Sequence, residues 1–464
     1  SEDIPEKEIL KRKDLRHLDS FTIDPDDAKD FDDALSIEKE NGHYKIGIHI
    51  ADVSHFFNSR SQINNEAEKR ATSVYLVDRT IPMLPEKLSN NLCSLKPNVD
   101  RLTFSVLIKM DERFKIISSW VGRTVIHSKK RFTYDEAQIS IDNTDGLFHE
   151  ELKNLNAIAK NVRKKRLESG SFNFRSNEVK FKLDENKKPV GVYKKLRKDT
   201  HKLVEEYMLL ANKIVAELII NHEKKHSKSF PFVYRIHEDP EQQKISELKN
   251  YIKQYGYSIN SNENNLAVSL NKLMKEIKGK PEESSIEKFA IRSMSKAKYS
   301  TNKEPHFGLS FKHYTHFTSP IRRFPDVMVH RLISDYTNGS KPKDKRYYDI
   351  MCKHSTKMEI NATKAERESI KYKQAEYMSN FIGKNFQATI SGITEWGIYG
   401  EIIENHCEGL IKISSMKDDR YEFDSEKIRI VGRNNKKTFR LGQVIKVKVI
   451  DTDIEKRTID LIVV

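Results

Sequence analysis

The sequence has 464 residues with 83 lysines and arginines against 68 aspartates and glutamates, a formal net charge of +15. This charge predicts a polyanionic partner, and no apolar run approaches the ~18 residues that a membrane span needs. Three widely spaced cysteines offer neither a disulfide framework nor a zinc knuckle, so we expect a nucleic-acid-binding protein of the cytoplasm.

The first part of the chain has the pattern of a short lead-in followed by strands. Residues 1–20 are polar and charged, and we expect them to precede the first domain. From residue 21 to about 135, apolar and polar residues alternate, as in half-buried strands. Asn41-Gly42 is a two-residue hairpin signal between two such runs. One face of the second run is apolar and contains Tyr44, Ile46, Ile48 and Ile50.

Helical patterns dominate residues 135 to 380. Asp199 is a candidate cap for a helix whose apolar residues recur at helical spacing. Pro240 and Pro325 are expected in the first turns of two further helices. The stretch 347–381 lacks proline and glycine, so we predict one long helix there that ends at Gly383.

After residue 383 the pattern returns to short strands separated by turn residues, which is typical of a small β-barrel. We therefore place a domain boundary near residue 383. The expected fold is an α+β domain over residues 21–382, followed by a small all-β barrel of the OB type over residues 383–464.

Six aspartates lie within the ten residues from Asp24 to Asp33, and Lys29 alone offsets them. Two carboxylates 4 Å apart repel by ~1 kcal/mol in water and by ~4 kcal/mol at an effective dielectric of 20. Converging carboxylates therefore need cations, and Mg²⁺ suits such a site because it is held by a few carboxylates and substrate phosphates. A solvated acidic turn is the alternative, whereas Lys29 and Leu35 exclude an EF-hand.

Four segments in order carry a family resemblance: "TIDPDDAKDFDDALSI", "YKIGIHIADVSHF", "RATSVYLVDRTIPMLP" and "HYTHFTSPIRRFPDVMVHRLI". Together they resemble the catalytic RNB domain of the ribonuclease II/ribonuclease R family over residues 20 to 380. The barrel is similar to the S1 RNA-binding OB fold that follows this domain in the family. Within it, "YEFDSEKIRIVGRNNKKTFRLGQ" is more similar to ribonuclease R than to ribonuclease II.

The resemblance implies a processive 3′→5′ exoribonuclease that hydrolyses RNA to nucleoside 5′-monophosphates by a two-metal-ion mechanism. Three carboxylates would hold Mg²⁺, with Mn²⁺ able to substitute, and a fourth would complete the shell. The first three fall on Asp24, Asp32 and Asp33, and the fourth falls on Asp30. The two other aspartates of the cluster are expected to be outer charge.

The same resemblance places the expected substrate contacts. The catalytic arginine of the family falls on Arg322, where a planar guanidinium can grip two phosphate oxygens. Tyr75 and Phe174 match aromatics that stack on the 3′-terminal nucleotides; Phe174 is preferred to Phe172, and core packing is the alternative for both positions. The remaining expected contacts are Arg323 and Glu206, with Glu205 as the alternative to Glu206.

In the barrel, Trp396 and Tyr399 occupy the aromatic positions that S1-like domains use to stack on RNA, although a core role is the alternative for Trp396. Lys412 replaces a frequent histidine and keeps a positive charge. His306, His313 and His316 lack cysteine or acidic companions at the spacing of a structural zinc site, so we expect packing or phosphate contacts there.

The family usually carries cold-shock domains before the RNB domain, whereas this sequence starts almost at the catalytic motif, so RNA capture is expected to depend on the barrel and a basic channel. We expect a monomer that acts on the 3′ end of single-stranded RNA, with no membrane partner. A catalytically inactive RNB-type RNA-binding protein is the alternative, and a basic endonuclease is a third possibility.

Overall fold

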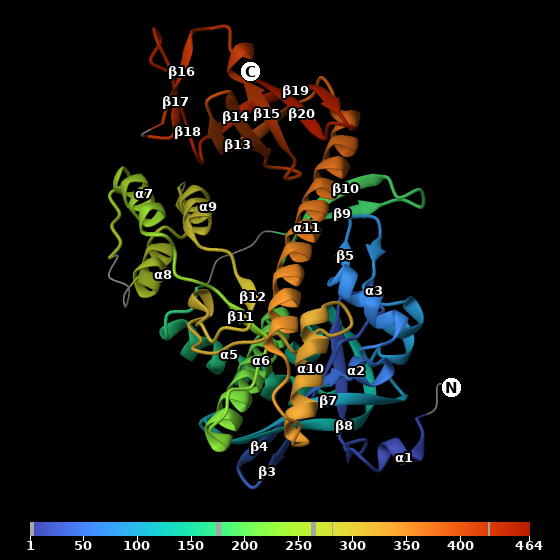
Figure 1. Ribbon diagram of the computed structural model, residues 1–464. Coiled ribbons are helices and arrows are strands. Elements are labelled where there is room, and N and C mark those ends of the chain that lie inside the picture. Colours follow the sequence, from blue (N-terminus) through green and yellow to red (C-terminus); the bar gives the residue numbers. More distant parts are fainter. Residues whose placement is uncertain (1–3, 173–177, 261–265, 281, 426) are drawn as a thin grey trace.

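A curled six-stranded sheet forms the base of the computed structural model, which describes residues 4–172, 178–260, 266–280, 282–425 and 427–464 (Figure 1). The long last strand pairs antiparallel with β7 along its first part and parallel with β2 along its end, so the sheet curls back on itself. Its strands are β1 (Lys13–Asp14), β2 (Ser20–Asp24), β3 (Asp33–Glu40), β4 (His43–Ala51), β7 (Asp100–Met110) and β8 (Ile116–Thr133).

The hairpin between β3 and β4 confirms the prediction made from Asn41-Gly42. Both residues have positive φ, 48° for Asn41 and 73° for Gly42, as a two-residue primed turn requires. The register runs from Glu40↔His43 at the turn to Asp33↔Ile50 at the far end. The apolar face of β4 is buried as predicted, with Tyr44, Ile46, Ile48 and Ile50 all in the core. The hairpin therefore fixes where Asp33 lies in the sheet.

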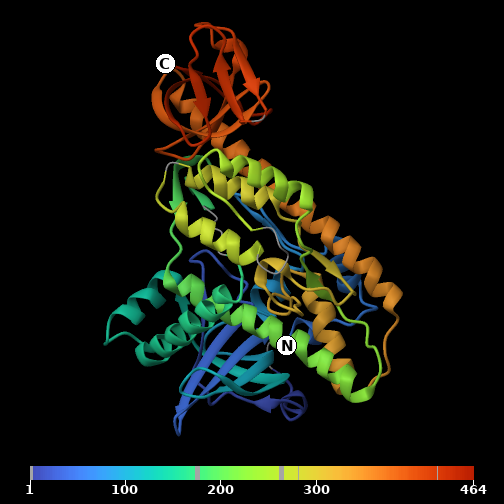
Figure 2. The same ribbon diagram turned by 90° about the vertical axis from the view of Figure 1, so that its left-hand side faces the viewer.

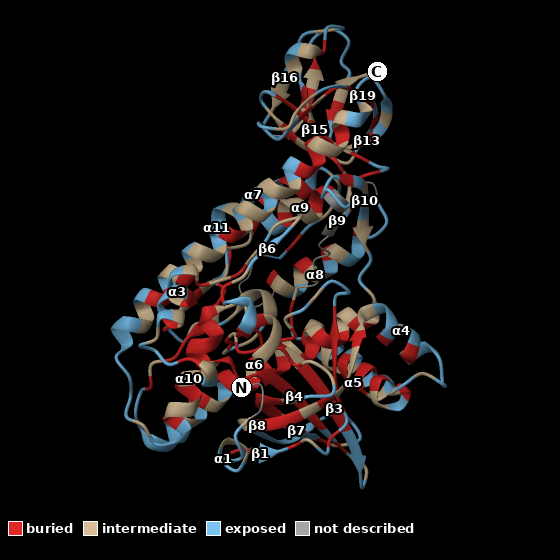
Figure 3. Cartoon of the chain, turned by 90° about the vertical axis from the view of Figure 1, so that its right-hand side faces the viewer, coloured by how far each residue is buried: buried red, intermediate tan, exposed pale blue. Residues whose placement is uncertain are grey.

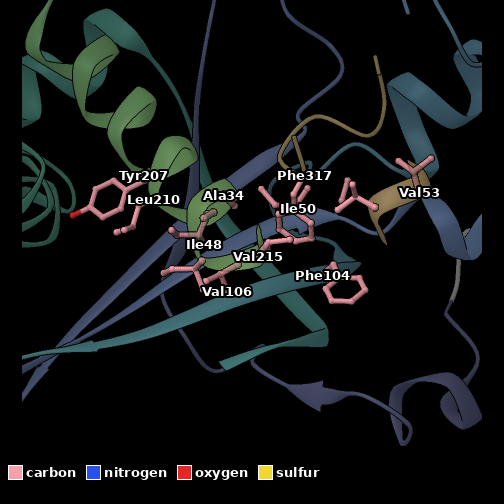
Figure 4. Packing of buried hydrophobic residues seen from close by; sticks show 14 of the residues in the cluster. Ala34, Ile48, Ile50, Val53, Phe104, Val106, Tyr207, Leu210, Val215 and Phe317 are labelled. Carbon is pink, nitrogen blue, oxygen red and sulfur yellow. The ribbon is translucent and has the colours of Figure 1, made fainter. Parts of the chain in front are cut away.

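Helices cover this sheet and form the main hydrophobic core with it. Figure 4 shows Tyr207, Leu210 and Val215 of α6 (Asp199–His226) packed near Ile48 and Val106 of the sheet. Figure 3 shows that the strands of this sheet are largely buried. The predicted helices that start near Asp199 and Pro325 are confirmed. The helices around the sheet are α2 (Val53–Phe56), α3 (Gln62–Arg70), α4 (Tyr134–Asp142), α5 (His149–Glu168), α6 (Asp199–His226) and α10 (Phe324–Thr337).

The segment expected to be a lead-in packs with the sheet from residue 12 onward. After the short helix α1 (Glu6–Ile9), Arg12 forms a buried ion pair with Asp52, with 2.8 Å between Nη2 and Oδ2. Strand β1 then pairs with β8, and Leu15 and Leu18 are buried. The sequence did not indicate this pairing with the sheet, because the segment is polar and β1 is only two residues long.

A second, smaller core belongs to three helices that lie beside the main body, α7 (Gln242–Lys253), α8 (Leu266–Glu276) and α9 (Glu283–Ser293). Pro240 precedes α7 by two residues, close to the predicted first turn. Three two-stranded ribbons complete the region: β5 (Val74–Tyr75) with β6 (Thr80–Ile81), β9 (Glu178–Leu183) with β10 (Pro189–Lys195), and β11 (Tyr234–Ile236) with β12 (Lys298–Ser300).

The predicted long helix is α11 (Lys345–Met378), which runs along the main body up to a closed barrel (Figures 1 and 2). Ala375 and Met378 at its end are part of the barrel core. None of the helices in the described ranges is both long and apolar enough to cross a membrane. The barrel strands are β13 (Asn385–Thr394), β14 (Gly397–Ile402), β15 (Glu408–Lys412), β20 (Thr458–Val463) and β19 (Val444–Asp453), with a separate sheet of β16 (Tyr421–Asp424), β17 (Arg429–Gly432) and β18 (Thr438–Arg440).

Candidate active site

The acidic segment is the connection between two neighbouring strands, since β2 ends at Asp24 and β3 begins at Asp33. The described pairing between these strands is at Ser20↔Ser36 and Phe21↔Leu35, so the chain opens into a loop beyond it. Ser94 holds the middle of the loop: its hydroxyl accepts from the Phe31 amide at 3.0 Å and donates to the Lys29 carbonyl at 2.8 Å.

The loop divides the six aspartates into an outer and an inner set. Asp26 and Asp27 are exposed, as expected for outer charge, whereas Asp24 and Asp32 are buried. The inner set faces the segment before α10, where the backbone amide of Ile321 donates to Oδ1 of Asp32 at 2.9 Å. This hydrogen bond links residues 289 positions apart and brings two of the sequence motifs into one site.

Burial is the main cause that raises the pKa of all four inner carboxyl groups. The pKa of Asp24 rises to about 7 and that of Asp33 to about 8, and the pKa values of Asp30 and Asp32 are also raised. The charge of Asp24 further raises the pKa of Asp33, while Arg322 opposes the shift. Negative charge is therefore confined where solvent stabilises it poorly.

These carboxylates could supply some of the ligands of a divalent cation. Among the described residues, none hydrogen-bonds to the buried Oδ2 of Asp24. In the same part of the chain, no three His, Cys, Asp or Glu side chains stand close enough to form a ready-made metal site. Mg²⁺ is commonly bound by one or two carboxylates together with waters and substrate phosphates, which agrees with such an arrangement.

The raised pKa values predict how the stability of the metal-free protein depends on pH. An unfolded aspartate titrates near pH ~4, so the folded form binds these protons more tightly. The resulting stabilisation is present below about pH 4 and is lost as pH rises through about 7 to 8. Asp33→Asn cannot ionise, and we expect its melting temperature in EDTA to rise relative to that of the wild type from about pH 5 to about pH 8.5. A difference in melting temperature that stays constant over this range would contradict the assignment.

Arg322 lies at the inner carboxylates with its guanidinium partly in solvent. Its Nε is 3.8 Å from Oδ2 of Asp32, and 42% of its side chain is exposed. Its Nη2 donates to the Ser319 hydroxyl at 3.1 Å. An exposed, oriented guanidinium next to buried carboxylates can receive a phosphate group that bridges the two charges.

Three further side chains adjoin the site, and the sequence indicated only one of them. Burial and the charges of Asp30 and Asp32 raise the pKa of the partly exposed Tyr75, while Arg322 lowers it. The other two residues, Glu366 and Tyr134, had no sequence signal. Oε1 of Glu366 in α11 accepts from the Tyr75 amide at 3.4 Å. The pKa of Tyr134 is raised by burial and by the charges of Asp33 and Asp24. Tyr134 stacks on His201 with 3.9 Å between ring centroids.

Glu206 is engaged by arginines instead of being presented to the site. Its side chain is 2% exposed, and it pairs with both Nη2 and Nε of Arg166 and with Nη1 of Arg163 at 3.3 Å. The neighbouring Glu205 is 37% exposed and pairs with Arg197 at 2.5 Å. Of the two glutamates that the sequence left open, Glu205 is thus the more accessible one.

Arg323 does not sit beside Arg322 at the surface, contrary to the expected substrate contact. Its side chain is 16% exposed, and its Nη2 donates to Oδ1 of Asp326 at 2.7 Å. Phe174 lies outside the described residues. Its alternative Phe172 packs edge to face against Phe307 with 5.1 Å between ring centroids, which is a core contact.

Of the two expected aromatics of the barrel, Trp396 is exposed and Tyr399 is half-buried. Trp396 lies in the turn between β13 and β14 and is 56% exposed, and its Nε1 is 3.5 Å from the Tyr399 hydroxyl. Tyr399 borders a cavity of about 540 Å³ between the barrel and the helices below it. This cavity is distinct from the inner carboxylates. Its cationic lining consists of Lys194, Lys288, Arg367, Lys371 and Arg457, against Glu287, Glu401 and Glu408.

Two of the three histidines before the Arg322 segment, His306 and His316, make packing contacts. Nδ1 of His316 is 2.9 Å from the Tyr299 hydroxyl, and Nδ1 of His306 accepts from the Leu309 amide at 3.2 Å. Burial lowers the pKa of both imidazoles.

Comparison with known families agrees with this geometry. The model of the RNB domain matches residues 12–339, and that of the S1 RNA binding domain matches residues 379–463. The chain therefore belongs to the family of RNB-domain proteins and carries an S1 domain after the RNB domain. Membership in this nuclease family implies dependence on a divalent metal.

Ribonuclease R of Aquifex aeolicus is 38% identical to the chain over 469 residues, which confirms the predicted resemblance. The match covers 99% of this chain and 66% of that relative, so the chain spans just under two thirds of its length.

Solved structures extend the comparison. RNase R of Mycoplasma genitalium in complex with ribose-methylated single-stranded RNA superposes with a TM-score of 0.93 at 28% identity, covering 100% of this chain and 73% of that one. Yeast Ssd1, described as a pseudonuclease, shares the fold with a TM-score of 0.74 at 21% identity, covering 92% of this chain and 54% of that one. The fold alone therefore does not establish catalysis, so a catalytic function has to be inferred from the side chains of the site.

Proposed function

We propose that this protein is a processive 3′→5′ exoribonuclease that hydrolyses RNA to nucleoside 5′-monophosphates with two Mg²⁺ ions. One observation carries the proposal: the buried Asp32, one of four neighbouring carboxyl groups with raised pKa values, lies against the partly exposed guanidinium of Arg322. Such a pairing is unfavourable as a purely structural feature because burial of charge costs several kcal/mol per ion. It is favourable where a cation and a phosphate complete the site.

The residues of the chain divide the work of hydrolysis. Asp24, Asp30, Asp32 and Asp33 would hold the ions. Bound divalent cations would activate water and neutralise charge on the phosphate. Arg322 would bind the phosphate oxygens and stabilise the charge that develops on them. Tyr75, beside Arg322, would stack on the terminal nucleotide, which requires no particular base.

The barrel and the cavity below it would guide the strand toward the carboxylates. Five cations line the cavity against three glutamates, and cationic grooves with aromatic side chains suit single-stranded nucleic acid. M. genitalium RNase R, of similar structure, is described with single-stranded RNA, which supports an RNA 3′ end as the partner here. We further propose that the protein is a cytoplasmic monomer and that Mn²⁺ can replace Mg²⁺.

A digestion experiment tests the function. A 5′-labelled single-stranded RNA and a circular RNA of the same sequence would be incubated with the protein in Mg²⁺ or in EDTA. We expect a ladder that shortens from the 3′ end, release of 5′-mononucleotides, an intact circle and no cleavage in EDTA. A shifted but uncut RNA would indicate the inactive binding protein, and an opened circle would indicate an endonuclease.

Trp396→Ala tests the role of the barrel. We expect RNA affinity to fall by about 1–3 kcal/mol, the value of one base stacked on an aromatic ring. Fluorescence anisotropy of an oligonucleotide in EDTA would measure binding without cleavage. The matched control is Trp120→Ala, because Trp120 is 41% exposed on β8, where Lys13 Nζ lies 5.2 Å from its ring. Equal losses in both variants would rule out a specific contact at Trp396.

A further inference from the structure

Residues 318–323, the arginine loop, lie outside the helices and named strands and are held by contacts with other segments, which include an isolated bridge between Thr72 and Arg323. One anchor lies on the segment that leads to Tyr75. The backbone amide of Ser73 donates to the Arg322 carbonyl at 3.0 Å, and the Thr72 hydroxyl donates to the same oxygen at 3.2 Å. The loop is thereby tied on the side of the expected stacking residue.

The second anchor is Asp326, which lies in the first turn of α10 and is fully buried. Its Oδ1 accepts from the backbone amide of Ser319 at 2.8 Å and from Nη2 of Arg323 at 2.7 Å. A single carboxylate oxygen thus holds residues on both sides of Arg322. Charge-assisted bonds of this kind are roughly twice as strong as neutral ones.

The contacts continue from Ser319 to the candidate metal site. The Ser319 hydroxyl accepts from Nη2 of Arg322 at 3.1 Å, and Nε of Arg322 lies 3.8 Å from Oδ2 of Asp32. The Ile321 amide donates to the other oxygen of Asp32 at 2.9 Å. Displacement of the loop would therefore move the guanidinium and release one oxygen of a candidate metal-binding carboxylate.

We propose that Asp326 is a positioning residue, which sets the arginine loop so that Arg322 and Asp32 meet the same phosphate. This inference rests on the proposed function. Asp326 touches neither the substrate nor the metal in this role, because it is fully buried beneath the loop. Residues that orient the groups of a site in this way typically contribute 10–100-fold to activity.

Asp326→Asn keeps the size of the side chain and removes its charge. We expect kcat to fall about 10–100-fold with KM for RNA changed less than about threefold, since the strand-binding surface is intact. In an Arg322→Ala background the same substitution should lower kcat clearly less than in the wild type, because only Asp32 remains of the two groups that the loop positions.

Two further variants separate positioning from loss of folding. Asp52→Asn removes another fully buried carboxylate, which pairs with Arg12 and Arg123, and its effect on kcat should be the same with or without Arg322. Ser319→Ala removes only the hydroxyl that orients Arg322, so it remains informative if Asp326→Asn does not fold. We expect Ser319→Ala to lower kcat in the wild-type background and to leave kcat unchanged in the Arg322→Ala background.

Hydrogen exchange of the peptide covering residues 318–323 reports the loop without any cleavage, and it should quicken at least tenfold in Asp326→Asn. Wild-type kcat and unchanged exchange in this variant would overturn the proposal, as would an equal loss of kcat in both backgrounds. If the wild-type protein itself failed to cleave RNA, the proposed function would fall, and unchanged exchange in Asp326→Asn would still overturn the anchoring of the loop.

Discussion

Asp33→Asn is expected to abolish RNA hydrolysis, with kcat falling by about three orders of magnitude or more, while RNA affinity stays within about threefold of the wild-type value. The rate falls because charge stabilisation by a bound cation supplies several kcal/mol to the transition state. Affinity persists because binding to nucleic acid depends on the cationic surface. Single-turnover digestion and anisotropy on the same oligonucleotide would measure both quantities.

Asp26→Asn is the matched control for this prediction. Asp26 lies in the same loop and loses the same charge, but its side chain is 95% exposed and faces Arg131 at 3.9 Å. We expect near wild-type hydrolysis. If both substitutions reduced the rate equally, the total charge of the loop would be responsible and the division into inner and outer aspartates would be wrong.

Arg322→Ala is expected to lower kcat by about 10²–10³, the usual effect of removing one donor that stabilises developing charge. The side chain is partly exposed, so the melting temperature should change little. Arg322→Lys should recover only part of the rate, because an ammonium keeps the charge but lacks the planar fork that binds two oxygens. Single-turnover kinetics with thermal denaturation would check both expectations.

The neighbouring Arg323 provides the comparison for Arg322. Arg323 is paired with the buried carboxylate of Asp326, and breaking a buried pair typically costs about 3–5 kcal/mol. Arg323→Ala should therefore lower the melting temperature strongly, unlike Arg322→Ala. Equal melting temperatures for the two variants would contradict the roles that the structure gives to these adjacent arginines.

Local patterns were sufficient for many elements of the fold. The Asn41-Gly42 turn, the helix through Leu203 and Leu210, and the long helix before Gly383 all depend on residues close together in the chain. Hairpin turns and amphipathic helices have short-range signals, so one sequence suffices to locate them. The six aspartates between Asp24 and Asp33 also carried a local signal, which was their density, whereas the choice of four among them came from the family resemblance.

Other features depend on pairings between distant segments. Tyr134 adjoins the carboxylates because β2 and β8 run parallel and place Asp24 opposite Thr133. Glu205 and Glu206 are adjacent on α6, and only the packing of Arg166 against Glu206 decides which one is buried. Arg322 and Arg323 are also adjacent; the family resemblance distinguished Arg322 as the catalytic arginine, and the pairing of Arg323 with Asp326 shows that Arg323 is the more buried of the two.

The sequence by itself determined the family, the order of the two domains and the acidic segment to which we assign the metal ions, because each is encoded by neighbouring residues. Only the tertiary structure decided which of two adjacent, like-charged side chains points to solvent and which is buried in an ion pair. Glu206 is buried by Arg166, which lies 40 residues away in the sequence, and Arg323 is buried with Asp326 of the next helix. The Ile321–Asp32 hydrogen bond joins residues 289 positions apart and places Arg322 at the carboxylates. Each outcome depends on how the segments pack, for which local sequence has no signal.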